Sequence, residues 1–129
     1  MMLEFLDTPL DESVLDSLRL LEDESEPNLL AQLLRLYLVE APHYVSEIEQ
    51  ALLAGNISMI EMPAHSLRSV SSSIGALYVC KYACALETAA RAQDRQAVII
   101  LVEELCREFE RVKLEIRYMI RLDGLSKAV

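Results

Sequence analysis

The sequence predicts an all-α fold, an up-down antiparallel four-helix bundle with an additional short N-terminal helix. Apolar residues recur at spacings of three and four along most of the chain, as on one face of a helix, and the alternation typical of strands is absent. Three glycines and four prolines among 129 residues leave little room for a turn-rich β fold. The predicted connections are short, which makes consecutive helices antiparallel neighbours.

The first two predicted helices differ greatly in length. A short stripe over residues 14–21 begins after Thr8-Pro9 or Asp11 and ends at an acidic run. A long stripe follows over residues 30–52. Pro42 lies inside it and is expected to kink or divide the helix, because proline has no N–H donor and its ring clashes with the preceding turn.

Glycines and a proline mark the ends of the later helices. Gly55-Asn56 supplies a stop and the next N-cap, Pro63 is suited to open a fresh helix, and Gly75 closes the third helical region. The three remaining helical regions are 57–74, 76–92 and 94–121. We expect one domain over residues 1–129, with 1–9 and 122–129 as peripheral tails.

The charge of the chain disfavours two classes of partner. The formal net charge is −9, with 13 acidic and 2 basic side chains in residues 1–62 and 8 acidic and 10 basic in residues 63–129. An acidic protein is repelled by phosphate backbones and by anionic lipid, so we expect no nucleic-acid partner. No segment approaches the roughly 20 apolar residues of a membrane span, so we expect no membrane insertion.

The chain start and the cysteines favour a cytoplasmic location. The first seven residues are acidic and lack the basic region of a signal peptide. Cys80, Cys84 and Cys106 are odd in number and fall within helical patterns, which predicts reduced, buried thiols. Cys80 and Cys84 lie one turn apart, but two thiols are a weak basis for a zinc site, which ordinarily takes four ligands.

The segment 64–75 is predicted to form a helix with two contrasting faces. At about 100° per residue, one face carries a histidine, a cation and two small hydroxyl side chains, and the other is apolar. The first face comprises His65, Arg68, Ser69 and Ser72, and the second comprises Leu67, Val70 and Ile74. His65 is therefore expected to point to solvent or to a shallow groove.

Such a face suits phosphoryl transfer between proteins. A neutral imidazole offers a nitrogen nucleophile near physiological pH, and a cation one turn away offsets the charge of an attached phosphoryl group. Small side chains around the ring let another protein approach closely. Met62, with Met59, either adds an apolar docking rim or only fills the core.

This stretch resembles the signature of histidine-containing phosphotransfer (HPt) domains, which is Ala-His-x-Leu-Lys-Gly followed six residues later by Gly. The likeness spans roughly residues 10–118. It rests on Ala64-His65-x-Leu67-Arg68-x6-Gly75-Ala76, on Cys84, Leu86 and Glu87, on Leu36-Tyr37-Leu38-x3-Pro42, and on Ala54-Gly55-Asn56.

The resemblance implies a helical bundle that acts in a two-component phosphorelay. Such domains accept a phosphoryl group from a receiver-domain aspartate or a histidine kinase pathway and pass it to another receiver. By this likeness His65 is the phosphoacceptor, through Nε2, Arg68 stabilises the phosphate, and Gly75 ends the active helix. Ser69, Ser72 and Met62 would form the receiver-docking face. No cofactor or metal is expected on the chain, because Mg²⁺ and the carboxylate donor would belong to the receiver.

Three residues depart from the family pattern. Arg68 replaces Lys, and a guanidinium differs from an ammonium in reach and in hydrogen-bonding geometry. Ser69 replaces Gly and adds bulk beside the imidazole, although its hydroxyl can bond to a phosphate oxygen or back to the helix. Pro63 can bend the backbone before the acceptor. These changes bear on transfer rate and partner choice more than on fold.

Two other functions remain open at this point. The chain can be a non-phosphorylated helical module that binds a kinase or receiver through the same face, and Ser69 favours this alternative. It can also be a metal-binding bundle, since Glu40-x-x-His43 matches the spacing of di-iron bundles and Glu61 lies four residues before His65. The di-iron motif should occur twice on facing core helices, and Pro42 interrupts this copy.

Overall fold

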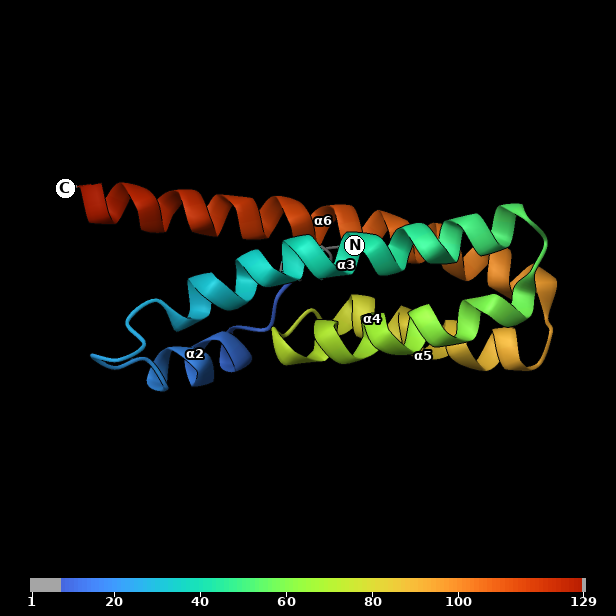
Figure 1. The fold of residues 1–129 in the computed structure, drawn as a ribbon, viewed down its shortest axis with the longest axis horizontal. Coiled ribbons are helices and arrows are strands. Elements are labelled where there is room, and N and C mark those ends of the chain that lie inside the picture. Colours follow the sequence, from blue (N-terminus) through green and yellow to red (C-terminus); the bar gives the residue numbers. More distant parts are fainter. Residues whose placement is uncertain (1–7, 129) are drawn as a thin grey trace.

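The computed structural model describes the backbone of residues 8–128 and the side chains of residues 8–122 (Figure 1). Residues 1–7, most of the predicted N-terminal tail, lie outside the described part. The elements in chain order are α2 (Glu12–Leu20), α3 (Leu29–Leu53), the 3₁₀ helix η1 (Ile57–Ile60), α4 (Glu61–Ser73), α5 (Leu77–Arg91) and α6 (Arg95–Ala128).

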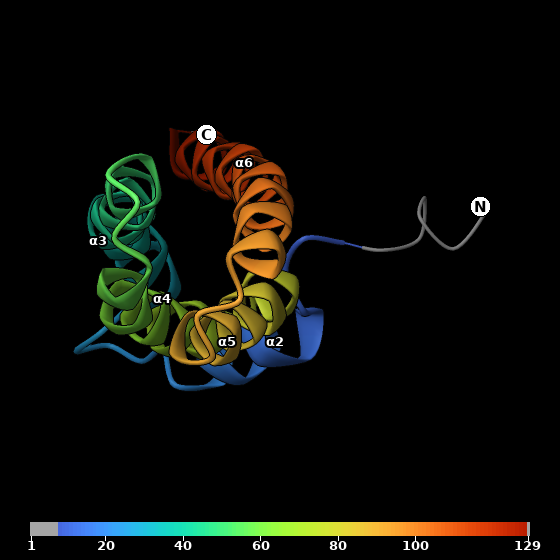
Figure 2. The same cartoon turned by 90° about the vertical axis from the view of Figure 1, so that its right-hand side faces the viewer.

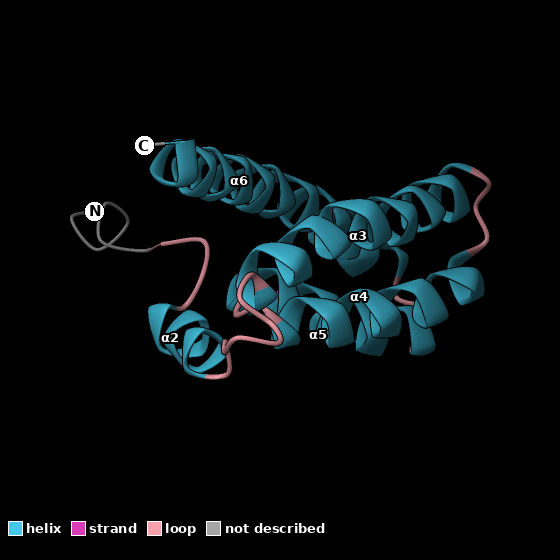
Figure 3. Cartoon of the chain, turned by 60° about the vertical axis from the view of Figure 1, so that its left-hand side comes forward, coloured by secondary structure: helices cyan, strands magenta, loops and turns pink. Residues whose placement is uncertain are grey.

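Four long helices form an antiparallel bundle. α4 packs against α3 and α5, and α6 packs against the same two helices, so α4 and α6 occupy diagonal corners (Figure 2). α2 lies outside this square and packs against α3. Residues 8–128 contain helices and connecting loops but no strand (Figure 3). The predicted all-α bundle with a short N-terminal helix is confirmed.

The core is one continuous apolar cluster to which every helix contributes. Full burial of one such side chain contributes about 1.5–3 kcal/mol. Fully buried examples are Leu15 of α2, Ile48 of α3, Leu67 of α4, Leu86 of α5 and Leu105 of α6. The cluster holds α4 in a fixed rotation, because Leu67 of the helix and Ile74 at its C-cap face inward. The opposite side of α4 is thereby turned to solvent.

One buried hydrogen bond joins α3 to α4. The Tyr37 hydroxyl and the Ser71 hydroxyl lie 2.8 Å apart, and both side chains are buried. The Tyr37 ring also packs against Phe109 of α6, with ring centroids 6.1 Å apart. Burial raises the pKa of Tyr37, although its hydrogen bond to Ser71 opposes the shift. Tyr37 thus ties three helices together.

The two prolines differ from the predictions. α3 is continuous from Leu29 to Leu53, so Pro42 does not divide it. The packing of Ala41 and Val45 on either side of Pro42 offsets the backbone hydrogen bond that is lost. Pro63 is the third residue of α4 rather than the first, because η1 precedes the helix directly. The missing N–H of Pro63 still breaks no helical hydrogen bond, since N–H groups in the first turn have no intrahelical acceptor.

The last helix is longer than the periodicity indicated. α6 continues to Ala128, whereas the pattern predicts an end near residue 121. The apolar stripe that carried the prediction ends at Met119 and Ile120, which pack against the core, and Arg121 and Leu122 are exposed. Hydrophobic spacing therefore located the helix as far as this stripe and missed its continuation.

Three helices end with the same hydrogen-bonding pattern, in which a residue of positive φ follows the helix. These residues are Gly55 (φ 72°), Gly75 (φ 78°) and Gln93 (φ 57°). After α4, the Gly75 N–H donates to Ser72 O and the Ala76 N–H donates to Ser71 O. This is the Schellman arrangement, which satisfies carbonyls at a helix end.

Gln93 is the position where this pattern costs stability. A side chain with a Cβ is strained at positive φ, and glycine is not. We expect Gln93→Gly to raise the free energy of unfolding by about 1 kcal/mol. Urea denaturation monitored by circular dichroism would measure it. Arg117→Gly, at an exposed position in the interior of α6, is the control and should lower stability by a similar amount. A loss of stability in both variants would contradict the prediction.

Candidate functional site

The solvent face of α4 carries the predicted site residues. The His65 side chain is 57% exposed, and Ser69, Ser72 and Met62 are also exposed. Arg68 is half-buried beside them, with its side chain against α5. The structure therefore gathers the five predicted residues on one side of α4, and Gly75 follows the end of that helix.

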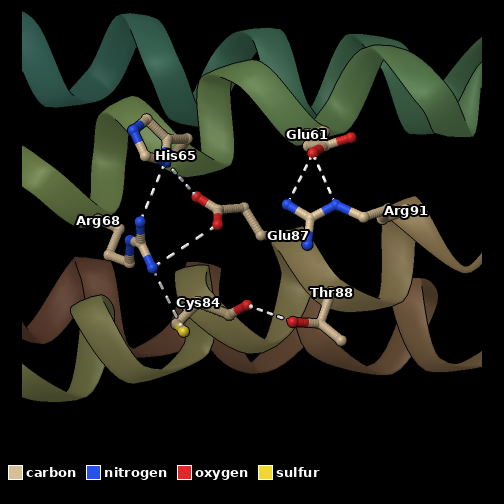
Figure 4. Close-up of polar contacts among 7 residues, drawn as sticks. All are labelled: Glu61, His65, Arg68, Cys84, Glu87, Thr88 and Arg91. Carbon is tan, nitrogen blue, oxygen red and sulfur yellow. Dashed lines mark hydrogen bonds and ion pairs between the residues drawn. The ribbon is translucent and has the colours of Figure 1, made fainter.

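The His65 ring is held by a carboxylate from the neighbouring helix. Glu87 of α5 places Oε1 at 2.7 Å from His65 Nδ1, and its own side chain is only 8% exposed (Figure 4). A contact this short is typical of a charge-assisted hydrogen bond, in which Nδ1–H donates to the carboxylate. The proton on Nδ1 leaves the lone pair on Nε2, and Figure 4 shows that nitrogen directed away from Glu87 and Arg68.

Arg68 lies within reach of the same ring nitrogen. Its Nη2 is 3.1 Å from His65 Nδ1, and its Nη1 is 3.7 Å from both Glu87 Oε2 and Cys84 Sγ. Nδ1 cannot donate to Glu87 and accept from Arg68 at once, and the shorter, charge-assisted contact with Glu87 prevails. The pKa of Arg68 lies above its ordinary value, because the guanidinium donates to Cys84 and lies near the Glu87 carboxylate.

A second cross-helix pair lies one turn from the first. Arg91 Nε and Nη2 donate to Glu61 Oε1 at 2.9 and 2.8 Å. Glu61 precedes His65 by four residues on α4, and Arg91 follows Glu87 by four residues on α5 (Figure 4). The two pairs therefore lie side by side along the α4–α5 seam.

The cysteines depart in part from the prediction of buried thiols. All three are free, but Cys84 is exposed beside Arg68, and Cys80 and Cys106 are half-buried. Desolvation by burial raises the pKa of Cys80 and raises that of Cys106 to about 11. Cys84 lies at the solvent edge of the α4–α5 contact, beside Arg68, and outside the apolar side of α5 that enters the core.

The described part of the chain bears on the alternative of a metal-binding bundle and on membrane insertion. There, no three His, Cys, Asp or Glu side chains cluster as a metal site would require. His43 is exposed on α3, away from the core where a di-iron ligand would lie. No helix among the described residues has the length and apolar character of a membrane span.

Neither the pairing of Glu87 with His65 nor that of Glu61 with Arg91 was predicted from the sequence. Glu87 carried a usable signal, because it is an acidic residue at a position where the apolar period of α5 calls for burial, between Leu86 and Ala90. A buried carboxylate needs a partner, and a histidine on the adjacent helix is a natural one. Nothing in the sequence pairs Glu61 with Arg91, since they are 30 residues apart.

A family model and several solved structures match this chain. The sequence model of the Hpt domain family matches residues 32–115. No curated protein matches the chain.

Several solved structures share the fold. Histidine-containing phosphotransfer protein B (HptB) of Pseudomonas aeruginosa has 27% sequence identity and a TM-score of 0.78, and the match covers 88% of this chain and 95% of that one. The maize protein ZmHP2 has 21% identity and a TM-score of 0.81, covering 91% of this chain and 86% of that one. MtHPt2 of Medicago truncatula has 21% identity and a TM-score of 0.83, covering 96% and 85%.

Proposed function

Since this chain belongs to the Hpt domain family, we propose that His65 is the residue on which it carries the phosphoryl group. The chain is a histidine phosphotransfer protein of a phosphorelay. The observation that carries the assignment of His65 is its contact with Glu87. With Nδ1–H bonded to a buried carboxylate at 2.7 Å, the exposed imidazole presents Nε2 as a free nucleophile.

The proposed step is an in-line transfer from an aspartyl phosphate. The lone pair of Nε2 forms the P–N bond as the P–O bond to the donor aspartate breaks, and the electron pair leaves with the aspartate carboxylate. Nδ1 keeps its proton, so the ring becomes a phosphorylated imidazolium with a positive charge. The reverse step passes the phosphoryl group to the next receiver.

Glu87 and Arg68 stabilise the two charges that this step creates. The Glu87 carboxylate faces the positive ring at Nδ1, where low exposure strengthens the attraction. Arg68 supplies a cation for the phosphoryl oxygens, and its contacts with Cys84 and Glu87 are at 3.7 Å, long enough to exchange for a phosphate. Glu87 is then a positioning residue, and Arg68 contacts the transferred group.

The partner supplies the remaining chemistry in this proposal. The chain exchanges phosphoryl groups with a receiver domain of a response regulator or a hybrid histidine kinase. Mg²⁺ and the catalytic aspartate belong to that receiver, as the resemblance to the family implies. The docking face for the receiver comprises Ser69, Ser72 and Met62. The chain acts in the cytoplasm as one domain over residues 1–129, with peripheral tails at 1–9 and 122–129.

Transfer profiling tests this function. Wild-type chain is incubated with a panel of receivers carrying ³²P on aspartate, and the label on each protein is followed in time. We expect fast labelling by at least one receiver. The phosphate on the chain should be acid-labile and alkali-stable, as in a phosphoramidate.

One alternative keeps specific support. Ser69 is exposed one turn from His65, and it adds bulk where a receiver must approach. A non-phosphorylated binding module would use the same face. Receiver binding without labelling of the wild type would favour that alternative, and labelling of the wild type would exclude it. Ser69→Gly labelled faster than wild type would show that the hydroxymethyl group hinders transfer.

Glu87 offers the sharpest test of the proposed charge balance. Glu87→Gln keeps an oxygen acceptor for Nδ1–H and removes the negative charge. A charge-assisted hydrogen bond is about twice as strong as a neutral one, so we expect transfer to slow on the order of tenfold. Quench-flow labelling would measure the rate, and ¹⁵N NMR of the ring would report the tautomer.

Glu103→Gln, an exposed site on α6, is the matched control and should transfer at the wild-type rate. Unchanged transfer in Glu87→Gln would contradict a role for the carboxylate charge. A lost tautomer preference with a slow rate would show that orientation, rather than charge, is what Glu87 provides.

A further inference from the structure

Helices α4 and α5 carry a small positive formal charge in an acidic protein. The chain has a formal net charge of −9, yet residues 61–91 contain three cations, Arg68, Lys81 and Arg91, and two carboxylates, Glu61 and Glu87. Glu87 is buried, so Glu61 is the carboxylate of this stretch that reaches solvent. Two of these cations, Arg68 and Arg91, lie along the α4–α5 seam beside the His65–Glu87 pair (Figure 4).

Arg91 lies closer to its carboxylate partner than Arg68 does, at 2.8 Å against 3.7 Å. Its Nε and Nη2 both donate to one oxygen, Glu61 Oε1, at 2.9 and 2.8 Å (Figure 4). Its side chain is nevertheless 64% exposed, against 38% for Glu61. Because two of its nitrogens are engaged by Glu61, the guanidinium is held in one orientation with Nη1 still available to a second acceptor.

This pair contributes little to folding. Ion pairs between exposed side chains stabilise proteins by about 0–1 kcal/mol, because both charges are well solvated. An ordered guanidinium has a different advantage, since it loses less side-chain freedom when a partner binds it. The restraint by Glu61 is better suited to recognition than to stability.

We propose that Arg91, oriented by Glu61, is a specificity-determining residue that docks on an acidic surface of the partner receiver. This rests on the proposed function of the His65 face. Arg91 lies one turn from the His65–Glu87 pair, so it contacts the receiver outside the reacting atoms. Charges at such a rim accelerate encounter and reject partners of like charge. The preferred receivers are those with carboxylates beside the phosphorylated pocket.

Direct binding separates this inference from the transfer chemistry. The dissociation constant for an unphosphorylated receiver is measured by isothermal titration calorimetry, with the receiver from the panel that binds wild type most tightly. We expect Arg91→Glu to weaken binding on the order of tenfold at low salt, and Arg91→Gln to weaken it less. The difference from wild type should shrink in 1 M salt, where the screening length falls to about 3 Å.

Arg107→Glu is the matched control. Arg107 is 62% exposed and pairs with Glu103 and Glu104 on α6, at the corner of the bundle diagonal to α4. The Arg107→Glu variant changes the net charge by the same amount as Arg91→Glu, but away from the His65 face. Its dissociation constant for the receiver should lie within twofold of the wild-type value. Thermal unfolding of every variant shows whether a loss of receiver binding is caused by a loss of folding stability.

Two results would overturn the inference. If Arg91→Glu and Arg107→Glu had the same dissociation constant for the receiver, only the net charge of the chain would affect binding. A deficit in Arg91→Glu that persists in 1 M salt would show that the loss is structural. Neither result depends on whether His65 is labelled, so the failure of this inference and the failure of the proposed function are distinguishable.

Discussion

His65→Gln is expected to abolish phosphorylation of the chain and to leave the fold intact. The substitution removes the Nε2 nucleophile, and a glutamine amide nitrogen cannot replace it. The side chain is 57% exposed, and the glutamine amide can still donate to Glu87, so the free energy of unfolding should change by no more than about 0.5 kcal/mol. Labelling by a phosphorylated receiver and thermal unfolding measure the two effects.

His43→Gln is the matched control, because His43 is the other histidine of the chain and is exposed on α3. It should be labelled at the wild-type rate, with the same acid lability. If His65→Gln were still labelled and His43→Gln were not, the phosphoacceptor would lie on α3. Loss of folding in His65→Gln would leave labelling uninformative, and His65→Asn, a smaller amide at the same site, would then be compared.

The sequence predicts those parts of this molecule that depend on local periodicity. The three-four spacing located each helix because an apolar face must be buried, and it placed His65 and Leu67 on opposite sides of α4 for the same reason. The end of α6 escaped prediction because the apolar spacing stops at Ile120, and the next two side chains, Arg121 and Leu122, are exposed. The continuity of α3 through Pro42 also escaped prediction, because packing around a single lost hydrogen bond cannot be read from spacing.

The candidate site shows the same division. The α4 half of the site follows from helical geometry. The partners on α5 do not, because the sequence does not fix the rotation and offset of one helix against another. Glu87 meets His65 across 22 residues of chain, and Arg91 meets Glu61 across 30. The spacing of Cys84 predicted a place in the core, but its side chain is exposed at the α4–α5 seam, in contact with Arg68.

Gly75→Ala is expected to give the largest loss of stability among conservative substitutions near the site. Gly75 has φ +78°, a conformation that costs an L-residue about 1–2 kcal/mol. A Cβ would also lie 3.0 Å from Val14 Cβ and 3.2 Å from both Asp11 N and Asp11 O. Two of these neighbours are backbone atoms that cannot yield, so overpacking adds about 1–3 kcal/mol. Urea denaturation should show a total loss of about 3 kcal/mol.

The close approach at Gly75 has a structural purpose. The Asp11 N–H donates to Gly75 O at 2.8 Å, and Asp11 caps α2 through its bond to the Ser13 N–H, so the α4–α5 turn anchors the start of α2. Gly55→Ala is the matched control, since Gly55 has φ +72° but its Cβ would meet only the Arg95 guanidinium, at 3.6 Å and beyond. It should lose only the conformational part, about 1–2 kcal/mol. Equal losses in the two variants would show that the contact with α2 contributes nothing. Folded Gly75→Ala should still be labelled on His65, because Gly75 acts by joining α2 to the bundle and touches no reacting atom.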